Sequence, residues 1–177
     1  MKNSILILLV CASIVSCKKE TISPAQLSAT SSNSENSVVQ PVVTFITSAP
    51  HTVYLSRGLN TLQSDSFSVS NATCYATSFQ FAVSISGTPN LSGFKFYING
   101  GQTAATITYA DGIVTVAMRR AVTLIEGNYN YILQARTFGE SGSSFSTVLS
   151  SASIVDNHRF LADIRNLPVE GNTLILR

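Results

Sequence analysis

The sequence has no tryptophan, only three cysteines and few charged residues. Charged residues make up 11% of the chain, against ~25% in an average protein. Between residues 21 and 94 only Glu35, Arg57 and Asp65 carry charge, so hydroxyl and amide groups must solvate most of this surface. Lysine and arginine are scattered, and without a basic patch we expect no nucleic-acid partner.

The apolar run at residues 5–15 is too short to cross a membrane, which takes about 20 apolar residues. Its length and the preceding Lys2 are typical of a signal peptide. The following Ile14-Val15-Ser16-Cys17 resembles a lipobox. The resemblance implies that residues 1–16 are removed and that Cys17, lipidated on its sulfur, is the first mature residue. An ordinary signal peptide with an incidental cysteine is the alternative.

The residues around Cys17 give an expectation about location. Residues 16–20, Ser-Cys-Lys-Lys-Glu, resemble the start of lipoproteins from Bacteroidetes-type bacteria. This resemblance implies a protein of the cell outer membrane, lipid-anchored and exposed on the outer face, with the periplasmic face as the alternative. Residues 17–40 are rich in Ser, Thr, Asn, Gln and Ala, and we expect a disordered tether because they cannot bury enough apolar surface.

With Cys11 in the signal peptide and Cys17 lipidated, Cys74 has no intramolecular partner and no disulfide is predicted. We interpret Cys74 as a small buried hydrophobic residue, the usual fate of a lone cysteine. A reactive thiol and a metal ligand are the alternatives.

From residue 41 onward the apolar pattern has a period of two, which is typical of strands with one buried face. The chain has turn signals every 8–12 residues, such as Asp111-Gly112, and no amphipathic helix. We therefore predict a single all-β domain over residues 41–177, an antiparallel sandwich. The expected strands lie at residues 42–46, 53–55, 67–69, 79–85, 94–98, 107–109, 113–118, 129–135, 145–149 and 173–176.

Two consecutive strands supply the predicted core. Their apolar residues share one phase and should pack together, whereas Tyr97 has the opposite phase and should point away from this core. The predicted core residues are Phe79, Phe81, Val83, Ile85, Phe94, Phe96 and Ile98.

The segment Leu124-Ile125-Glu126-Gly127-Asn128-Tyr129 resembles the tyrosine corner of immunoglobulin-like domains. In that family a tyrosine at the start of strand F donates a hydrogen bond to backbone upstream. Residues 67–101 resemble bacterial surface modules of the same class. The resemblance spans about residues 42–177 and implies an immunoglobulin-like sandwich, although the Cys–Trp–Cys set of antibody domains is missing.

No residue pattern predicts catalysis, a cofactor or a metal site. His51 and His158 each lack a second ligand at metal spacing. The stretch Asp156-Asn157-His158 could be an acid–base group or a partial calcium loop, but we interpret it as an interstrand turn because no Asp-x-Asp-x-Asp run supports calcium. The stretch at residues 139–142, Gly-Glu-Ser-Gly, is not a nucleophile elbow and is interpreted as a hairpin loop.

Three function classes remain: an adhesive or fibre-associated interaction module, a glycan-binding lipoprotein beside an outer-membrane transporter, and an enzyme, which has the least support. Tyr97 is the one candidate for a glycan platform. Terminal strands often lie at sheet edges, where another protein can add a strand. The candidate contact residues on these strands are Val42, Val43, Thr44, Thr173, Leu174 and Ile175; the alternative is that both strands are paired internally.

Overall fold

The computed structural model describes residues 39–177. The predicted signal peptide, Cys17 and nearly all of the predicted tether lie outside the described residues.

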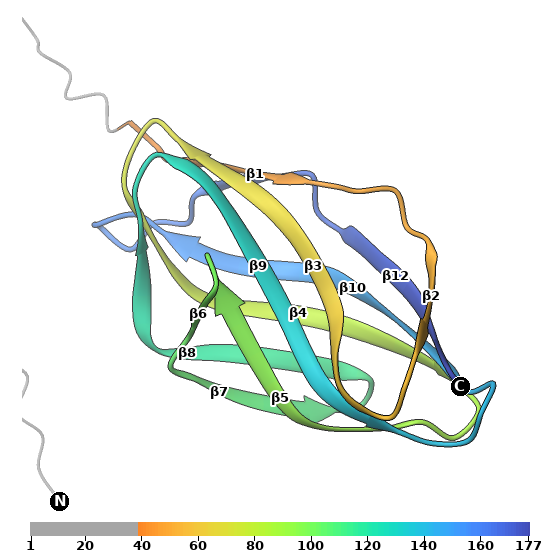
Figure 1. The fold of residues 1–177 in the computed structure, drawn as a ribbon. Coiled ribbons are helices and arrows are strands. Elements are labelled where there is room, and N and C mark those ends of the chain that lie inside the picture. The colour runs from red at the N-terminus through yellow and green to blue at the C-terminus, as the bar shows by residue number, and fades with distance from the viewer. Residues whose placement is uncertain (1–38) are drawn as a thin grey trace, which may run out of the picture. The chain divides into compact units, whose positions relative to one another are not determined.

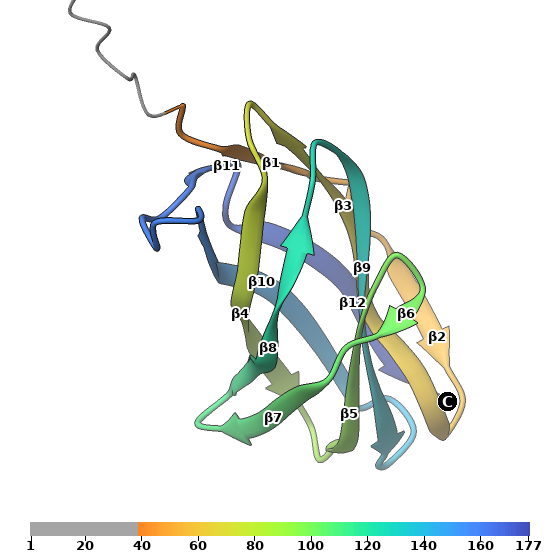
Figure 2. The same cartoon turned by 90° about the vertical axis from the view of Figure 1, so that its left-hand side faces the viewer.

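Residues 39–177 form twelve strands in two six-stranded sheets, shown from two directions in Figures 1 and 2. Sheet A has the order β11-β1-β3-β9-β5-β6, and sheet B the order β2-β12-β10-β4-β8-β7. The predicted all-β sandwich is confirmed. The strands are β1 (Val42–Ile46), β2 (Thr52–Leu55), β3 (Gly58–Ser70), β4 (Cys74–Ser86), β5 (Asn90–Ile98), β6 (Gly101–Gln102), β7 (Ala105–Ala110), β8 (Ile113–Leu124), β9 (Gly127–Phe138), β10 (Ser144–Val155), β11 (Asp163–Arg165) and β12 (Val169–Leu176).

The strand order is immunoglobulin-like. In sheet A, β1-β3-β9-β5 follows the A-B-E-D order of that fold, and in sheet B, β12-β10-β4 follows G-F-C. The β7–β8 hairpin extends sheet B beyond β4. Two pairings are parallel, β1 with β11 and β2 with β12, and the other strand pairs are antiparallel.

Aromatic side chains from both sheets fill the core. The ring of Tyr131 on β9 lies 6.0–6.3 Å, between centroids, from the rings of Phe45, Phe79, Phe81 and Phe96. Phe79 and Phe81 come from sheet B and Phe96 from sheet A, so the two predicted core strands pack across the sandwich rather than side by side.

The predicted core is confirmed at Phe79, Phe81, Val83, Phe96 and Ile98, all of which are buried. Phe94 is half-buried. Ile85 was wrongly included: its side chain is 44% exposed. The alternation is correct, but Ile85 is the next-to-last residue of β4 and lies at the rim, where the last three residues of the strand are all exposed.

Two tight turns are set by residues that accept positive φ. Asp111 and Gly112 join β7 to β8 with φ of 52° and 73°, and Asn99 and Gly100 join β5 to β6 with φ of 49° and 76°. Positive φ at both central residues is the condition for a two-residue hairpin turn with the twist of its strands. The hairpin predicted at Asp111-Gly112 is therefore confirmed.

The loop at residues 139–142 is not a hairpin loop as predicted. It joins β9 in sheet A to β10 in sheet B, and these strands do not pair. A Gly-rich turn signals a reversal, but the residues of the turn do not reveal that the chain changes sheet.

Strand β3 is longer than predicted. It begins at Gly58, nine residues before the strand predicted at 67–69, because polar residues interrupt the alternation in its first half.

The expectation that the terminal strands lie at sheet edges is wrong. Strand β1, with Val42, Val43 and Thr44, lies between β11 and β3. Strand β12, with Thr173, Leu174 and Ile175, lies between β2 and β10. Each gains its second neighbour through a parallel pairing, which covers Val42, Val43 and Thr44 of β1 and Thr173–Leu176 of β12, so the candidate contact residues lie between two neighbours.

Candidate functional site

Tyr97 lies on the outer face of sheet A, as its phase predicted. It alternates on β5 with the buried Phe96 and Ile98, and it is half-buried among its neighbours. In the sheet it is directly opposite Ile132 of β9 on one side and Gln102 of β6 on the other.

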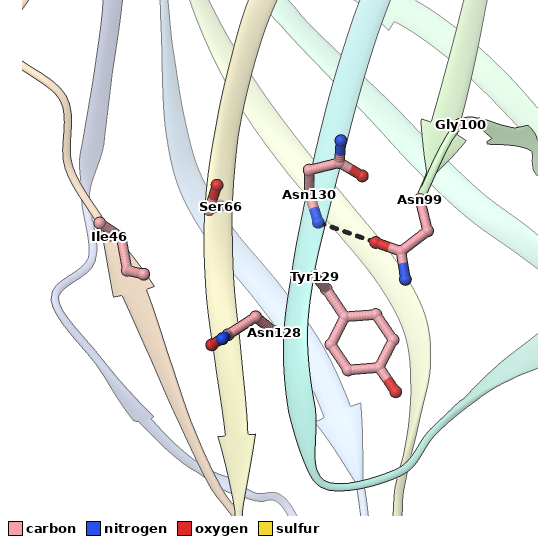
Figure 3. Close-up of a pocket in the computed structure, with 7 residues that line it drawn as sticks. All are labelled: Ile46, Ser66, Asn99, Gly100, Asn128, Tyr129 and Asn130. Atoms are coloured by element: carbon pink, nitrogen blue, oxygen red, sulfur yellow. Dashed lines mark hydrogen bonds between the residues drawn. The ribbon is translucent and has the colours of Figure 1, made fainter.

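A groove opens on the same face of sheet A, toward the start of β9 (Figure 3). The sheet register places Ser66 of β3 opposite both Ile46 of β1 and Asn130 of β9. Asn128, two residues earlier on β9, lies on the same face opposite Ser68. Figure 3 shows these side chains side by side across three neighbouring strands.

The position of Asn99 depends on its turn. With φ of 49°, Asn99 closes the β5–β6 hairpin and donates its backbone N–H to the carbonyl of Asn130 at 3.0 Å. Its side-chain Oδ1 accepts a hydrogen bond from the backbone N–H of Asn130, also at 3.0 Å, which is the dashed line in Figure 3. The turn is thereby fixed to β9, and the Nδ2 group of Asn99 is left for other contacts.

The groove has a volume of ≈720 Å³ and is lined by neutral residues. An amide group offers two donors and an acceptor, and a hydroxyl offers one donor and two acceptors. Such a lining can bind neutral polar groups through hydrogen bonds. It provides neither a fixed charge nor a nucleophile with a base beside it. The lining residues are Ile46, Ser66, Asn99, Gly100, Asn128, Tyr129 and Asn130.

Tyr129 forms the hydrogen bond expected from the tyrosine-corner resemblance, but on a different strand. Its hydroxyl donates to the carbonyl of Ile125 at 2.9 Å, and its ring stacks on Phe67 with centroids 5.2 Å apart. The assignment to strand F is wrong, because β9 occupies the place of strand E. The local motif specifies the turn and its hydrogen bond. It does not specify which strand of the sandwich follows the turn, and here that strand is β9 in the place of strand E.

Sequence analysis missed a polar cluster in the core. The hydroxyl of Tyr131 donates to Oδ2 of Asp65 at 3.3 Å. The two N–H groups on Nε2 of Gln63 are shared among three acceptors at 3.0–3.1 Å, namely Oδ2 of Asp65, the Tyr131 hydroxyl oxygen and the carbonyl of Val169. Ser48 donates to the other Asp65 oxygen at 2.8 Å. Burial, and then the negative charge of Asp65, raise the pKa of Tyr131 well above its ordinary value. The one sequence feature that pointed to this cluster is the spacing of Gln63 and Asp65, two polar residues two positions apart that would share one face of a strand.

This cluster connects the two sheets; Gln63, Asp65 and Tyr131 are buried, and the cluster meets the surface at the exposed Ser48. A register shift between Thr61 and Gln63 in the β3–β9 pairing leaves Leu62 as the extra residue directly before Gln63. The side-chain amide of Gln63 reaches β12 in sheet B through Val169. We interpret the cluster as structural.

The other candidate residues are dispersed. Asp156 accepts hydrogen bonds from the backbone N–H groups of His158 and Phe160, both at 2.8 Å, so the predicted turn is confirmed. His51 is exposed directly before β2. Within residues 39–177 no group of three metal-ligating side chains is present, and no helix there is long and apolar enough to cross a bilayer.

Cys74 is fully buried, which confirms its interpretation as a small hydrophobic core residue. Burial raises the pKa of its thiol to about 11, so the thiol is protonated at neutral pH.

Comparison with known proteins gives only distant structural likenesses. No family model matches the chain, and the curated proteins contain no matching sequence. A non-cellulosomal cohesin from Archaeoglobus fulgidus aligns over 78% of this chain and 91% of its own, with 9% identity and a TM-score of 0.43. The module CaCohA2 from Clostridium acetobutylicum aligns over 77% and 92%, with 10% identity and a TM-score of 0.39. The major pilin subunit of Bacillus cereus aligns over 77% of this chain and 40% of its own, with 8% identity and a TM-score of 0.35.

Proposed function

We propose that this protein is a lipid-anchored module of the cell envelope that acts by binding, as an adhesive or fibre-associated component, and that the outer face of sheet A is its binding surface. The proposal has two parts. The lipobox-like sequence at Cys17 supports the anchor, and the groove on sheet A supports the binding surface.

The observation that carries the binding role is the arrangement of three asparagines at one end of sheet A. Asn128 and Asn130 project from the same face of β9, and the side chain of Asn99 is fixed beside them by its bond to Asn130. The side chain of Asn99 is held by its Oδ1 bond to Asn130, and the backbone of Asn128 and Asn130 is held by pairing with Ser68 and Ser66 of β3. Polar groups held in place before binding lose little conformational entropy when a partner docks.

Replacing Asn128 and Asn130 together by alanine tests the surface. Both side chains are exposed, so the double variant should keep its melting temperature within a few degrees. The measurement is the adhesion of cells that display the protein. Cells that display the double variant should lose most of the adhesion seen with the wild type. A matched control is Ser150→Ala with Ser151→Ala, two exposed residues of β10 in sheet B. Equal adhesion of the two double variants would show that the sheet A surface is not used.

A second candidate function, glycan binding, is favoured by the position of Tyr97. Its ring lies on the same outer face, opposite Gln102 and Ile132, and a half-exposed aromatic ring beside amide groups is a common arrangement for stacking on a sugar. The two candidates separate on a glycan array. Binding that Tyr97→Ala abolishes would favour the glycan, and adhesion without any array signal would favour a protein partner.

A further inference from the structure

The four outermost strands of the two sheets differ in how their free edges are protected. Natural sheets protect an edge with short strands, charge, proline or a bulge, because free backbone groups pair readily with another chain. Strand β6 has two residues. Strand β11 has three, of which Asp163 and Arg165 are charged. Strand β2 has four, and Arg177 stacks over its Tyr54 at 4.1 Å.

Strand β7 has none of these protections. It contains six residues, Ala-Thr-Ile-Thr-Tyr-Ala, without charge or proline, and its pairing with β8 is free of register shifts. Both views of the fold show β7 at the margin of sheet B (Figures 1 and 2). In sheet A, β6 pairs only with Tyr97 and Ile98, so the rest of β5 also has a free edge. That edge is protected by a register shift between Ser92 and Lys95 and by the charge of Lys95.

The register shows which backbone groups of β7 are free. Ala104 accepts a hydrogen bond from the N–H of Arg119 at 2.9 Å, and the hairpin closes with Ala110 opposite Ile113. In an antiparallel ladder, alternate residues direct their N–H and C=O groups toward the partner strand. The even-numbered residues of β7 therefore face β8, whereas Ala105, Ile107 and Tyr109 direct both groups outward. No backbone hydrogen bond within residues 39–177 joins these three residues to anything beyond the strand.

The same margin is incompletely buried. Ala105, Ile107 and Tyr109 are half-buried although their side chains point inward, and Tyr109 packs on Phe94 of β5 with ring centroids 5.6 Å apart. A strand added beside β7 would cover these apolar side chains as well as pair the free backbone groups. Apolar burial stabilises association by roughly 25 cal/mol per Å² before ordering costs.

We infer that the occupant of this edge is β7 of a second copy of the chain, paired antiparallel about a two-fold axis at Ile107. The free backbone groups of both copies can pair only if the odd-numbered residues of one β7 lie opposite the odd-numbered residues of the other. With the axis at Ile107, each Ile107 lies opposite its own copy, and Ala105 of each chain lies opposite Tyr109 of the other. The charges favour this pairing. Asp111 follows one end of β7, and Arg119 and Arg120 lie beside the other end, so each aspartate comes to the arginine end of the second copy. Such an isologous contact closes as a dimer.

Sedimentation of the chain beginning at Lys18 tests the inference, since residues 39–177 contain both sheets and the core between them. The wild type should show a reversible monomer–dimer equilibrium. Thr108→Lys, which places a charge on the exposed face of the edge, should raise the dimer dissociation constant at least about tenfold. Thr123→Lys, an exposed residue of the inner strand β8, is the matched control and should dimerise like the wild type. A wild type that stays monomeric up to about 1 mM would overturn the inference.

A cross-link tests the register. With the axis at Ile107, Thr106 lies opposite Thr108 of the second copy in a non-hydrogen-bonded pair, where Cα atoms are about 4.5 Å apart and a disulfide fits. Thr106→Cys with Thr108→Cys should form a covalent dimer on oxidation with glutathione disulfide, and neither single variant should do so. The buried Cys74 does not compete. Equal cross-linking of a single variant, or none in the double variant, would contradict the two-fold pairing. These results do not depend on any ligand of sheet A.

Discussion

Phe81 illustrates how single residues determine the stability of this domain. Its ring is fully buried between the two sheets and lies 6.0 Å from the rings of both Phe96 and Tyr131, measured between centroids. Packing of this density leaves little room for neighbours to move into an empty volume. The ring therefore contributes both its own burial and the contacts of the rings around it.

Replacing Phe81 by alanine should lower the free energy of unfolding by about 3–5 kcal/mol, a large part of the 5–15 kcal/mol typical of a domain. Urea unfolding followed by circular dichroism measures the change. Ser84→Ala on the same strand, at an exposed position, should change it by less than about 0.5 kcal/mol. Similar effects of the two substitutions would contradict the packing described for β4.

At the level of residues, the alternating pattern predicted burial well where a strand is long and apolar on one face. It identified Phe79, Phe81 and Phe96 because each alternates along its strand with residues that are polar or small. It failed at Ile85, because a pattern of period two does not show where a core ends. It also could not predict the burial of Gln63 and Asp65, whose hydrogen-bond partners come from a distant strand.

At the level of strands, the sequence pattern predicted most strands and the hairpin at Asp111-Gly112. It did not predict which strands are neighbours in a sheet. The parallel pairings of β1 with β11 and of β2 with β12 join segments more than a hundred residues apart. Local turn chemistry has no information about such contacts. For this reason the open edge was expected at the chain termini, whereas the structure places it at β7.

The internal position of β12 leads to a prediction about the C-terminus. Leu174 and Leu176 are almost fully buried, and the strand is paired with both β10 and β2. Deleting residues 172–177 removes two buried leucines, each worth about 2–5 kcal/mol, together with the backbone partner of β2. We expect the truncated domain to be unfolded in far-UV circular dichroism.

Deleting Arg177 alone is the control for this truncation. Arg177 is exposed, donates one backbone hydrogen bond to Leu55 and covers the ring of Tyr54. Its loss should lower the free energy of unfolding by only about 1 kcal/mol. A folded domain after removal of residues 172–177 would mean that β12 is dispensable and that its pairing on both sides is incorrect.

For the whole molecule, the low charge of the sequence and the two proposed contact surfaces agree. The groove on sheet A presents amides and hydroxyls, and the β7 edge presents threonines and free backbone groups. The groove has a neutral lining, so contacts through it should depend little on salt. The β7 pairing also brings Asp111 toward Arg119 and Arg120 of the second copy, so the dimer should weaken as salt rises. Contacts through either surface are favoured when the protein is held at high local concentration near its partners.

The anchor proposed at Cys17 would provide that concentration, and its removal is the last prediction. Cys17→Ser eliminates the sulfur that carries the diacylglyceryl group. In cells grown with radiolabelled palmitate, the wild-type protein should be labelled and found in the membrane fraction, and the Cys17→Ser variant should be unlabelled.

Cys74→Ala is the matched control. The Cys74 thiol is buried and inaccessible to an acyl donor, so the label of this variant should equal that of the wild type. Two acyl chains bind a membrane stably whereas one binds marginally, so release of the unlabelled variant from the membrane should be nearly complete. A wild-type protein without label, or equal label in the Cys17→Ser variant, would show that Cys17 is not the anchor.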